Sequence, residues 1–338
     1  MKKRMFNKRI LSLAMATMFA FTGCGSSSSS ATEDGLEEFT IVLDWYPNAI
    51  HTFLYAAIEN GYFAEEGLEL NIQFPANTND GISMPASGQA DVGIYYQQDA
   101  IMTAVEEDVP IVSVGAITQE SLNVVISLTE SGIAGADDLE GKKIGYAGTV
   151  LSEEMIKAML EHVGLDADSC DYIDVGFDLL SALTTKQVDA TIGNMVNHEV
   201  PQLTEYGFDV NYFYPTDFGV PEQYELVFLA GEKLVAENPE KLAGFLRACE
   251  KGFADMKNNP EESLAILLNN QNQENFPLSE TVETESLQIL LPALENENGA
   301  FLHQEVSVWQ ENADWMFARG VLSEQTDVSD LVVNLLED

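Results

Sequence analysis

Basic residues are scarce in this sequence, and acidic residues are abundant. Its 338 residues include 15 Lys and Arg against 56 Asp and Glu, which gives a formal net charge of −41. A surface of that charge excludes the phosphate contacts that nucleic-acid binding needs, and it disfavours broad contact with anionic lipid. We therefore expect no nucleic-acid partner, and we interpret the charge as a well-solvated outer surface.

Cysteine is also scarce, with three residues in the chain. The sequence has no CxxC pair, no Cys/His spacing typical of zinc ligands, and no loop with the Lys and spacing of a P-loop. We therefore expect no metal site and no cofactor. Cys249 falls on an apolar stripe with helical spacing, which predicts a core position. Cys170 precedes a predicted strand elsewhere in the chain, so we expect no disulfide between these two residues.

The apolar run near the N-terminus is too short to span a membrane. It covers residues 10 to 21, whereas a permanent transmembrane helix needs about 20 apolar residues, and a cluster of Lys and Arg precedes it. Such a segment is typical of an export signal that is removed. It runs into Phe21-Thr22-Gly23-Cys24, which resembles a bacterial lipobox, where a lipid is attached to the Cys thiol. The alternative is an ordinary signal peptide with an incidental Cys.

The segment after Cys24 is rich in Ser and Gly, so it buries little apolar surface and is expected to be a flexible tether. We therefore predict a lipoprotein signal peptide at 1–23 and a Ser-rich tether at 24–36. With Cys24 lipidated, the folded part is expected at the extracytoplasmic face of the cell membrane.

Residues 37–338 alternate short apolar runs with helical patterns, which predicts an α/β fold with parallel sheets. The alternation occurs twice, and the chain crosses over near 126–130 and returns near 219–225. We interpret this as two α/β lobes joined by a two-strand hinge, with 37–127 plus 225–338 in lobe 1 and 128–224 in lobe 2. Because ligands bind at the carboxyl ends of strands and at domain interfaces, the sequence predicts a ligand cleft between the lobes.

Aromatic and polar residues gather where the predicted strands end. The first strand leads into Trp45, Asn48 and His51, and the third leads into Tyr95 and Gln97. The other candidates follow strands of the second lobe or lie on the return crossover, and they are Thr149, Phe177, Asn194, Asn197, Glu199, Tyr224 and Glu225. Several alternatives remain open: Trp45 and Tyr95 as core residues, His51 as a capping or exposed side chain, and Glu199 as a solvated helix acid.

Several segments resemble the thiamine pyrimidine-precursor-binding family, which includes lipoproteins of thiamine-salvage importers and has the fungal hydroxymethylpyrimidine synthases as relatives. The segments are Leu43-Asp44-Trp45-Tyr46-Pro47-Asn48, Gly176-Phe177-Asp178-Leu179-Leu180, Asn197-His198-Glu199 and Gly219-Val220-Pro221 with Tyr224-Glu225-Leu226-Val227-Phe228. The resemblance implies a periplasmic-binding-protein type II fold and a formylated or hydroxymethylated aminopyrimidine ligand, although relatives also bind sulfonates, nitrate or riboflavin.

The resemblance also implies roles for the candidate residues. A flat heteroaromatic ring is expected between aromatic faces, for which Trp45 and Tyr95 are candidates. Glu199 is the family-matched carboxylate for the exocyclic amine. The remaining polar groups of the ligand are expected to form hydrogen bonds with four side-chain amides, those of Asn48, Gln97, Asn194 and Asn197.

Two rival functions have weaker support in the sequence. The fungal synthases use a Cys-rich iron-binding motif, which is missing here, so we do not expect an enzyme. A sulfonate or nitrate site would need Arg or Lys in the cleft, and none stands at the predicted strand ends. We therefore predict a monomeric solute-binding lipoprotein whose partners are an aminopyrimidine, the permease subunits of an ABC importer and, through its lipid anchor, the membrane.

Overall fold

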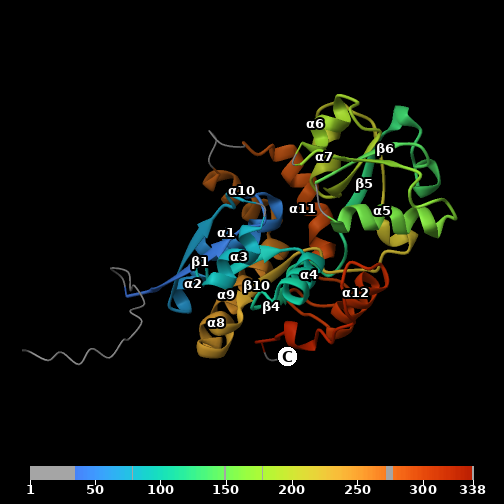
Figure 1. Ribbon diagram of the computed structural model, residues 1–338. Helices are drawn as coiled ribbons and strands as arrows, with labels where there is room; N and C mark the ends of the chain where they lie inside the picture. The colour runs from blue at the N-terminus through green and yellow to red at the C-terminus, as the bar shows by residue number, and fades with distance from the viewer. Residues whose placement is uncertain (1–34, 78, 148–149, 177, 272–276, 337–338) are drawn as a thin grey trace, which may run out of the picture.

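The computed structural model describes residues 35–77, 79–147, 150–176, 178–271 and 277–336, and their chain forms two α/β lobes (Figure 1). The predicted signal peptide, nearly all of the tether, Cys24, Thr149 and Phe177 lie outside the described residues. None of the described helices is long and apolar enough to cross a membrane.

The sheet of the first lobe has the strand order β2-β1-β3-β10-β4. Its strands are β1 (Glu37–Val42), β2 (Leu68–Gln73), β3 (Val92–Tyr95), β4 (Ile111–Ala116) and β10 (Val227–Gly231). β1 pairs in parallel with β2 and β3, whereas β10 lies antiparallel between β3 and β4. The sheet is therefore mixed rather than parallel, because β10 enters it from the opposite lobe.

The sheet of the second lobe repeats this plan with the order β7-β6-β8-β5-β9. Its strands are β5 (Asn123–Leu128), β6 (Lys143–Tyr146), β7 (Asp171–Asp174), β8 (Ala190–Met195) and β9 (Val210–Phe213). β6 pairs in parallel with β7 and β8, and β5 lies antiparallel between β8 and β9. The chain thus crosses between the lobes before β5 and not near 126–130, so the strand that the sequence placed in lobe 1 belongs to the second sheet.

Helices cover both sheets, and those of the first lobe come from both ends of the described chain. They are η1 (Ala49–His51), α1 (Thr52–Glu59), α2 (Tyr62–Glu65), α3 (Asp80–Ser87), α4 (Gln97–Glu107), α8 (Glu232–Glu237), α9 (Pro239–Asn258), α10 (Pro260–Asn270), α11 (Glu280–Leu294) and α12 (Val306–Ala318). The second lobe has α5 (Val150–His162), α6 (Leu179–Thr184), α7 (Glu199–Glu205) and η4 (Pro215–Phe218). α9 and α10 each begin with Pro after Asn, where the missing N–H of Pro leaves no helical hydrogen bond unmade.

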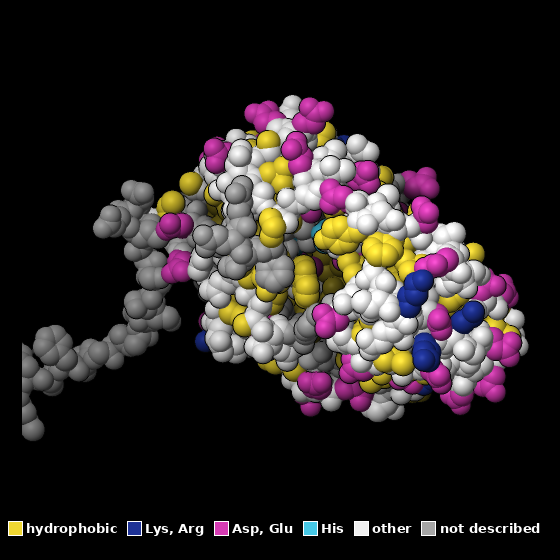
Figure 2. All heavy atoms as spheres, turned by 90° about the horizontal axis from the view of Figure 1, so that it is seen from above, with side chains coloured by type: hydrophobic (Ala, Val, Ile, Leu, Met, Phe, Trp, Pro, Cys, Tyr) yellow, Lys and Arg dark blue, Asp and Glu magenta, His cyan; other side chains and the backbone are white. Residues whose placement is uncertain are grey.

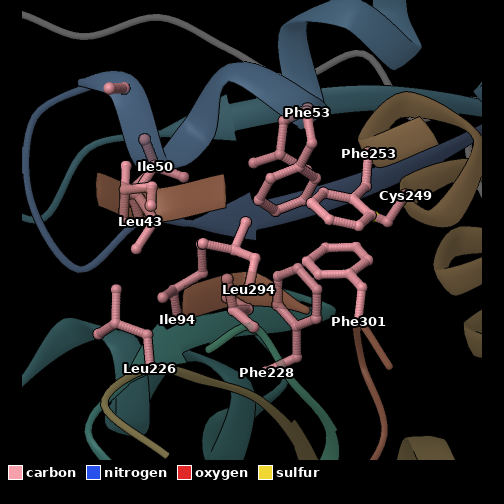
Figure 3. Close-up of a cluster of buried hydrophobic side chains, with 14 of the residues drawn as sticks. Leu43, Ile50, Phe53, Ile94, Leu226, Phe228, Cys249, Phe253, Leu294 and Phe301 are labelled. Atoms are coloured by element: carbon pink, nitrogen blue, oxygen red, sulfur yellow. The ribbon is translucent and has the colours of Figure 1, made fainter. Parts of the chain in front are cut away.

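Aromatic side chains form the core between α1, α9 and the first sheet (Figure 3). Phe253 stacks on Phe301 with ring centroids 4.3 Å apart, and the fully buried thiol of Cys249 lies on the same helix. Gly252 allows α9 to pack closely on α1, because a Cβ at that position would lie 2.2 Å from the carbonyl oxygen of Phe53. Cys249 is therefore a core residue, as its spacing predicted, and both it and Cys170 are free thiols.

The two lobes also touch outside the crossing strands. α11 of the first lobe packs on α7 of the second, and Arg319, which follows α12, forms ion pairs with Glu154 and Glu161 of α5. Viewed from above, a hollow with many hydrophobic side chains on its walls opens in the molecule, whereas acidic side chains are spread over the outer surface (Figure 2).

Candidate functional site

A cavity of about 120 Å³ lies between the lobes. The first lobe contributes the end of β3 and the start of α4, and the second contributes the start of β5, the ends of β6 and β8, and the first turns of α5. The return connection before β10 also lines the cavity through Gln223 and Glu225. The site therefore lies at the carboxyl ends of strands from both sheets, where the sequence predicted it.

Two carboxylates line this cavity, Asp99 in the first turn of α4 and Glu225 in the connection before β10. Glu225 is 3% exposed, and its Oε2 accepts hydrogen bonds from the backbone N–H groups of Leu122 and Asn123, each at 2.9 Å. Burial raises the pKa of Glu225, although these hydrogen bonds act in the opposite direction. Burial and the neighbouring charge of Glu225 raise the pKa of Asp99 to about 7. A ligand with N–H donors would offset the cost of keeping both groups charged.

Three buried amide oxygens of the cavity wall have no protein partner: Gln98 Oε1, Asn194 Oδ1 and Gln223 Oε1. The orientation of Asn194 follows from its amide nitrogen, which donates to the carbonyl oxygen of Thr191 at 3.1 Å and to the Thr191 hydroxyl at 3.0 Å. A carbonyl oxygen only accepts, so the amide oxygen of Asn194 must point away from it.

The orientation of Gln98 is fixed in two steps. The amide nitrogen of Asn312 donates to the carbonyl oxygens of Glu222 and Val308 at 2.8 and 2.9 Å. Its amide oxygen then accepts from Gln98 Nε2 at 2.7 Å. The remaining oxygen of Gln98 is therefore an acceptor without a donor. Since buried polar groups are nearly always satisfied, these oxygens indicate a ligand or water that donates hydrogen bonds.

The described residues that line the cavity include no Lys, Arg or His. Tyr95 and Tyr96 supply aromatic surface, with ring centroids 5.2 Å apart in an edge arrangement. The position of Tyr95 depends on Gly81 of α3, where a Cβ would lie 2.9 Å from the tyrosine ring. The described wall thus combines acceptor groups with apolar ring surface and holds no basic side chain.

The candidates that follow β1 do not line the cavity. Asn48 Oδ1 accepts from the backbone N–H of Ile50 at 3.1 Å, which caps η1. His51 is fully buried, its Nδ1 accepts from the Asn48 N–H, and its Nε2 donates to Asp44 Oδ1 at 2.9 Å. These two residues shape the loop, so the capping alternative describes His51. Trp45 is 39% exposed and packs edge-on against Tyr46 at 5.7 Å.

Gln97 and Tyr224 connect the return strand to the first lobe. Gln97 Oε1 accepts from the Tyr224 N–H at 2.8 Å, and the Tyr224 hydroxyl accepts from the Glu305 N–H at 2.9 Å. The amide nitrogen of Gln97 is buried without a partner. Both residues support the cavity from behind and do not line it.

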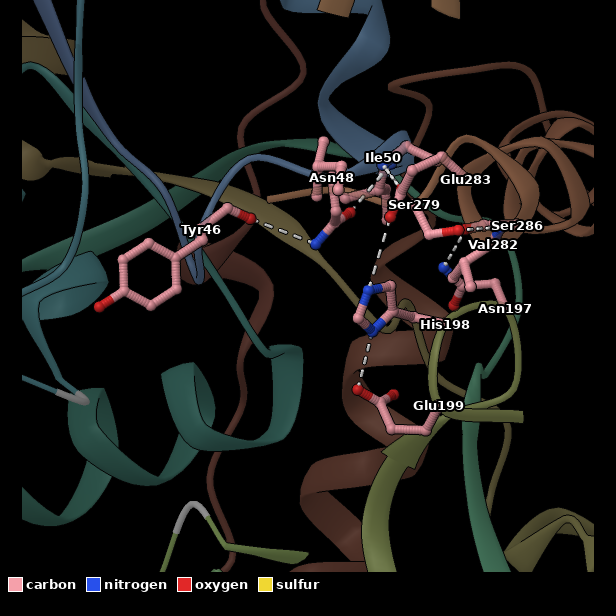
Figure 4. A network of polar contacts seen from close by, with 12 residues as sticks. Tyr46, Asn48, Ile50, Asn197, His198, Glu199, Ser279, Val282, Glu283 and Ser286 are labelled. Atoms are coloured by element: carbon pink, nitrogen blue, oxygen red, sulfur yellow. Dashed lines mark hydrogen bonds and ion pairs between the residues drawn. The ribbon is translucent and has the colours of Figure 1, made fainter. Parts of the chain in front are cut away.

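Asn197 lies in the loop that follows β8, and Glu199 is the first residue of α7; both lie beside α11 (Figure 4). Asn197 Nδ2 donates to Ser286 Oγ at 3.0 Å. Glu199 is half-buried, accepts from the Met195 N–H at 2.8 Å and lies 3.0 Å from His198 Nδ1. Met195 lines the cavity, so Glu199 is one residue removed from the wall.

Of the predicted site residues, the cavity therefore brings together Tyr95, Asn194 and Glu225. The sequence interpretation missed Gln98, Asp99, Asn123 and Gln223. Asp99 offered a signal, because it lies in the first turn of α4, the helix that follows β3 and Tyr95 directly.

Comparison with known proteins matches residues 48–263 to the family model described as "NMT1/THI5 like". The formylaminopyrimidine-binding protein of Halalkalibacterium halodurans is 43% identical over 95% of this chain and 97% of its own length. The 4-amino-5-hydroxymethyl-2-methylpyrimidine phosphate synthase of Legionella pneumophila is 27% identical over 73% of this chain and 78% of its own.

Among solved structures, the alkanesulfonate-binding protein SsuA of Xanthomonas axonopodis pv. citri superposes with a TM-score of 0.70 at 14% identity, covering 91% of this chain and all of that one. The two-lobed fold is thus the periplasmic-binding-protein fold that the resemblance implied. With the family model covering residues 48–263 and a relative 43% identical along nearly its whole length, the chain belongs to the NMT1/THI5-like family.

Proposed function

We propose that this protein is the extracytoplasmic solute-binding component of an ABC importer and that its ligand is an aminopyrimidine of the formylaminopyrimidine type. The observation that carries the proposal is the acceptor character of the cavity. Two carboxylates and three unpartnered amide oxygens line it, and its described lining residues include no Lys or Arg. An aminopyrimidine presents N–H donors on a flat ring and so complements this wall. The 43% identity with a formylaminopyrimidine-binding protein supports the same ligand class.

In this proposal the ring lies against Tyr95, and the exocyclic amine donates to Asp99 or Glu225. A stacked aromatic pair contributes about 0.5–1.5 kcal/mol beyond area burial, and a hydrogen bond to a charged group about 1.5–3 kcal/mol. Asn194 and Gln223 offer oxygens to a side-chain N–H of the ligand. Glu199 remains a proposed acceptor at the edge of the cavity.

Three further predicted contacts remain proposals. Trp45 does not line the cavity, so a ring contact from it requires the lobes to move. Thr149 and Phe177 are proposed on the resemblance alone.

The cavity disfavours the anion binders among the alternatives. A sulfonate or nitrate prefers Arg, Lys or clustered N–H donors, whereas this wall offers oxygens. The superposition on an alkanesulfonate-binding protein, at 14% identity, concerns the fold.

We also propose that the protein binds its ligand without transforming it. Pyrimidine phosphate synthases are among its relatives, but the sequence has three Cys residues and no Cys-rich motif. The proposal includes a lipid anchor at Cys24, a monomeric state, a two-strand hinge between the lobes and delivery of the ligand to permease subunits.

Thermal unfolding with added ligands tests the proposal. A ligand that binds only the folded state stabilises it by about 2.7 kcal/mol at a concentration of 100 times Kd. We expect formylaminopyrimidine to raise the Tm and taurine, nitrate and alkanesulfonates to leave it unchanged. A rise with sulfonates and none with the pyrimidine would overturn the proposal, and mass spectrometry of copurifying small molecules gives an independent check.

A further inference from the structure

Glu283 of α11 touches the loops that follow β1 and β8, which belong to different lobes. It is 1% exposed. Its Oε2 accepts from the backbone N–H of Ala49 at 2.7 Å, in the first-lobe loop. Its Oε1 lies 3.7 Å from Nε2 of His198, in the second-lobe loop, which is an ion-pair distance and not a hydrogen bond. One buried carboxylate therefore connects the two lobes beside the cleft (Figure 4).

The contacts continue from His198 to the cavity wall. His198 Nδ1 lies 3.0 Å from Glu199 Oε1, and Glu199 Oε2 accepts from the backbone N–H of Met195 at 2.8 Å. Met195 lines the cavity. A path of four side-chain contacts thus leads from η1 through α11 to the second-lobe wall, and the hydrogen bond from Asn197 to Ser286 runs beside it.

The charges along this path favour a protonated imidazole. Glu199, the first residue of α7, faces His198 from the adjacent position and Glu283 faces it from α11, while Asp44 and His51 form a pair on the first-lobe loop. Burial lowers the pKa of His198. The hydrogen bond to Glu199 and the charges of Glu199 and Glu283 outweigh this effect and raise the pKa to about 8. Burial raises the pKa of Glu283, and the charge of His198 lowers it. An imidazolium between two carboxylates neutralises part of a charge that would otherwise be buried unpaired.

We propose that Glu283 is a positioning residue that acts through positively charged His198 to hold the two cleft loops in the arrangement that forms the cavity. The inference rests on the proposed function for its ligand readout, but its structural part does not need a ligand. A purely local role, in which Glu283 only accepts the Ala49 hydrogen bond, makes a different prediction. If the role is only local, E283Q should behave like the wild type, because the Gln amide keeps an acceptor oxygen for the Ala49 N–H although it has no charge.

The test compares the wild type with E283Q, and S286A serves as a control that removes the neighbouring interlobe hydrogen bond without changing charge. In the ligand-free proteins, the imidazole resonances of the four His residues are titrated by NMR, and H198Q identifies the His198 signal. We expect the His198 midpoint, about 8 in the wild type, to fall in E283Q, although Glu199 still raises it there, and to stay unchanged in S286A. A midpoint that E283Q leaves in place overturns the inference, whether or not any ligand binds.

The second readout is the affinity for formylaminopyrimidine by calorimetry at pH 6.0 and pH 9.5. Titration of Asp99 changes the affinity of both proteins equally, so its effect cancels in the ratio of wild-type to E283Q affinity. Loss of an ion pair of this kind is expected to weaken binding about three- to fivefold. We therefore expect the wild type to bind about three- to fivefold more tightly than E283Q at pH 6.0, where His198 is charged, and equally tightly at pH 9.5, where it is neutral. A ratio that does not depend on pH overturns the positioning role. If the wild type itself does not bind the pyrimidine, the proposed function fails, and the NMR titration still decides whether Glu283 acts on His198.

Discussion

Replacing Asp99 with Asn is expected to make the ligand-free protein more stable and the ligand complex weaker. Asp99 lines the cavity, and burial together with the charge of Glu225 raises its pKa to about 7. Folding therefore disfavours the charged carboxylate at neutral pH. Asn has the same shape and no charge, so the substitution removes this cost and also removes an acceptor for the ligand.

The sign and size of the stability effect follow from proton linkage. The folded pKa is about 7 and the ordinary value is 3.8, so the folded state holds its proton more tightly. The stability from this tighter binding is fully present below the ordinary value and is lost as the pH rises through about 7. Each pH unit between the two values corresponds to about 1.4 kcal/mol. Because water in the cleft screens part of the effect, we expect D99N to gain about 2–4 kcal/mol above pH 7.

Urea unfolding at pH 5 and pH 8 measures this gain. The difference between D99N and the wild type should increase by about 1–3 kcal/mol from pH 5 to pH 8. Glu107, an exposed carboxylate on the same helix, provides the control variant E107Q, for which we expect no such increase. A difference that is the same at both pH values would refute the assignment of a charge cost to Asp99.

Ligand binding gives the opposing readout for the same variant. A hydrogen bond to a charged group contributes about 1.5–3 kcal/mol to the binding free energy. Without it, the affinity of D99N for the aminopyrimidine should fall about ten- to a hundredfold. A stabilised D99N with wild-type affinity would show that Asp99 is buried in the cavity wall without contacting the ligand.

Two other variants test separate parts of the proposal. If the exocyclic amine donates to Glu199 instead of to Asp99 or Glu225, E199Q should bind the aminopyrimidine about ten- to a hundredfold more weakly than the wild type and should discriminate less against a des-amino analogue in calorimetry. An unchanged preference would exclude Glu199 as the acceptor of the amino group. C24S should abolish acyl labelling and release the protein from membranes in a fractionation assay, and retention of the variant would contradict lipidation at Cys24.

The sequence predicted the elements of the fold better than their assignment to sheets. α9 was recognised by its apolar stripe with Cys249 on it, whereas the predicted lobe boundary at 127 left most of β5 in lobe 1. The run of β5 is buried on both faces, so its pattern is the same whichever sheet it joins. Its membership of the second sheet depends on pairing with β8 and β9, which local patterns do not encode.

The candidate site was predictable in position but only partly in its residues. Tyr95 and Asn194, expected at strand ends, and Glu225, expected on the return crossover, all line the cavity. Asn48 and His51 have side chains suited to recognition, yet both satisfy backbone groups of their own loop. Whether a polar side chain is used locally or left free depends on hydrogen bonds to distant residues, as the bond from Gln98 to Asn312 shows.

The antiparallel strand β10 has a consequence for how the chain can fold. It pairs with β3 and β4 across more than 110 residues of sequence, and all of the second lobe lies between them. As the chain emerges from its N-terminus, the sheet of the first lobe stays open between β3 and β4 until residue 231 is available. Contacts of such long range slow folding, because the closure entropy is lost before the contact energy is gained. The second lobe, whose strands β5 to β9 are continuous in the chain, can complete its own sheet first and so bring β10 back to its place between β3 and β4.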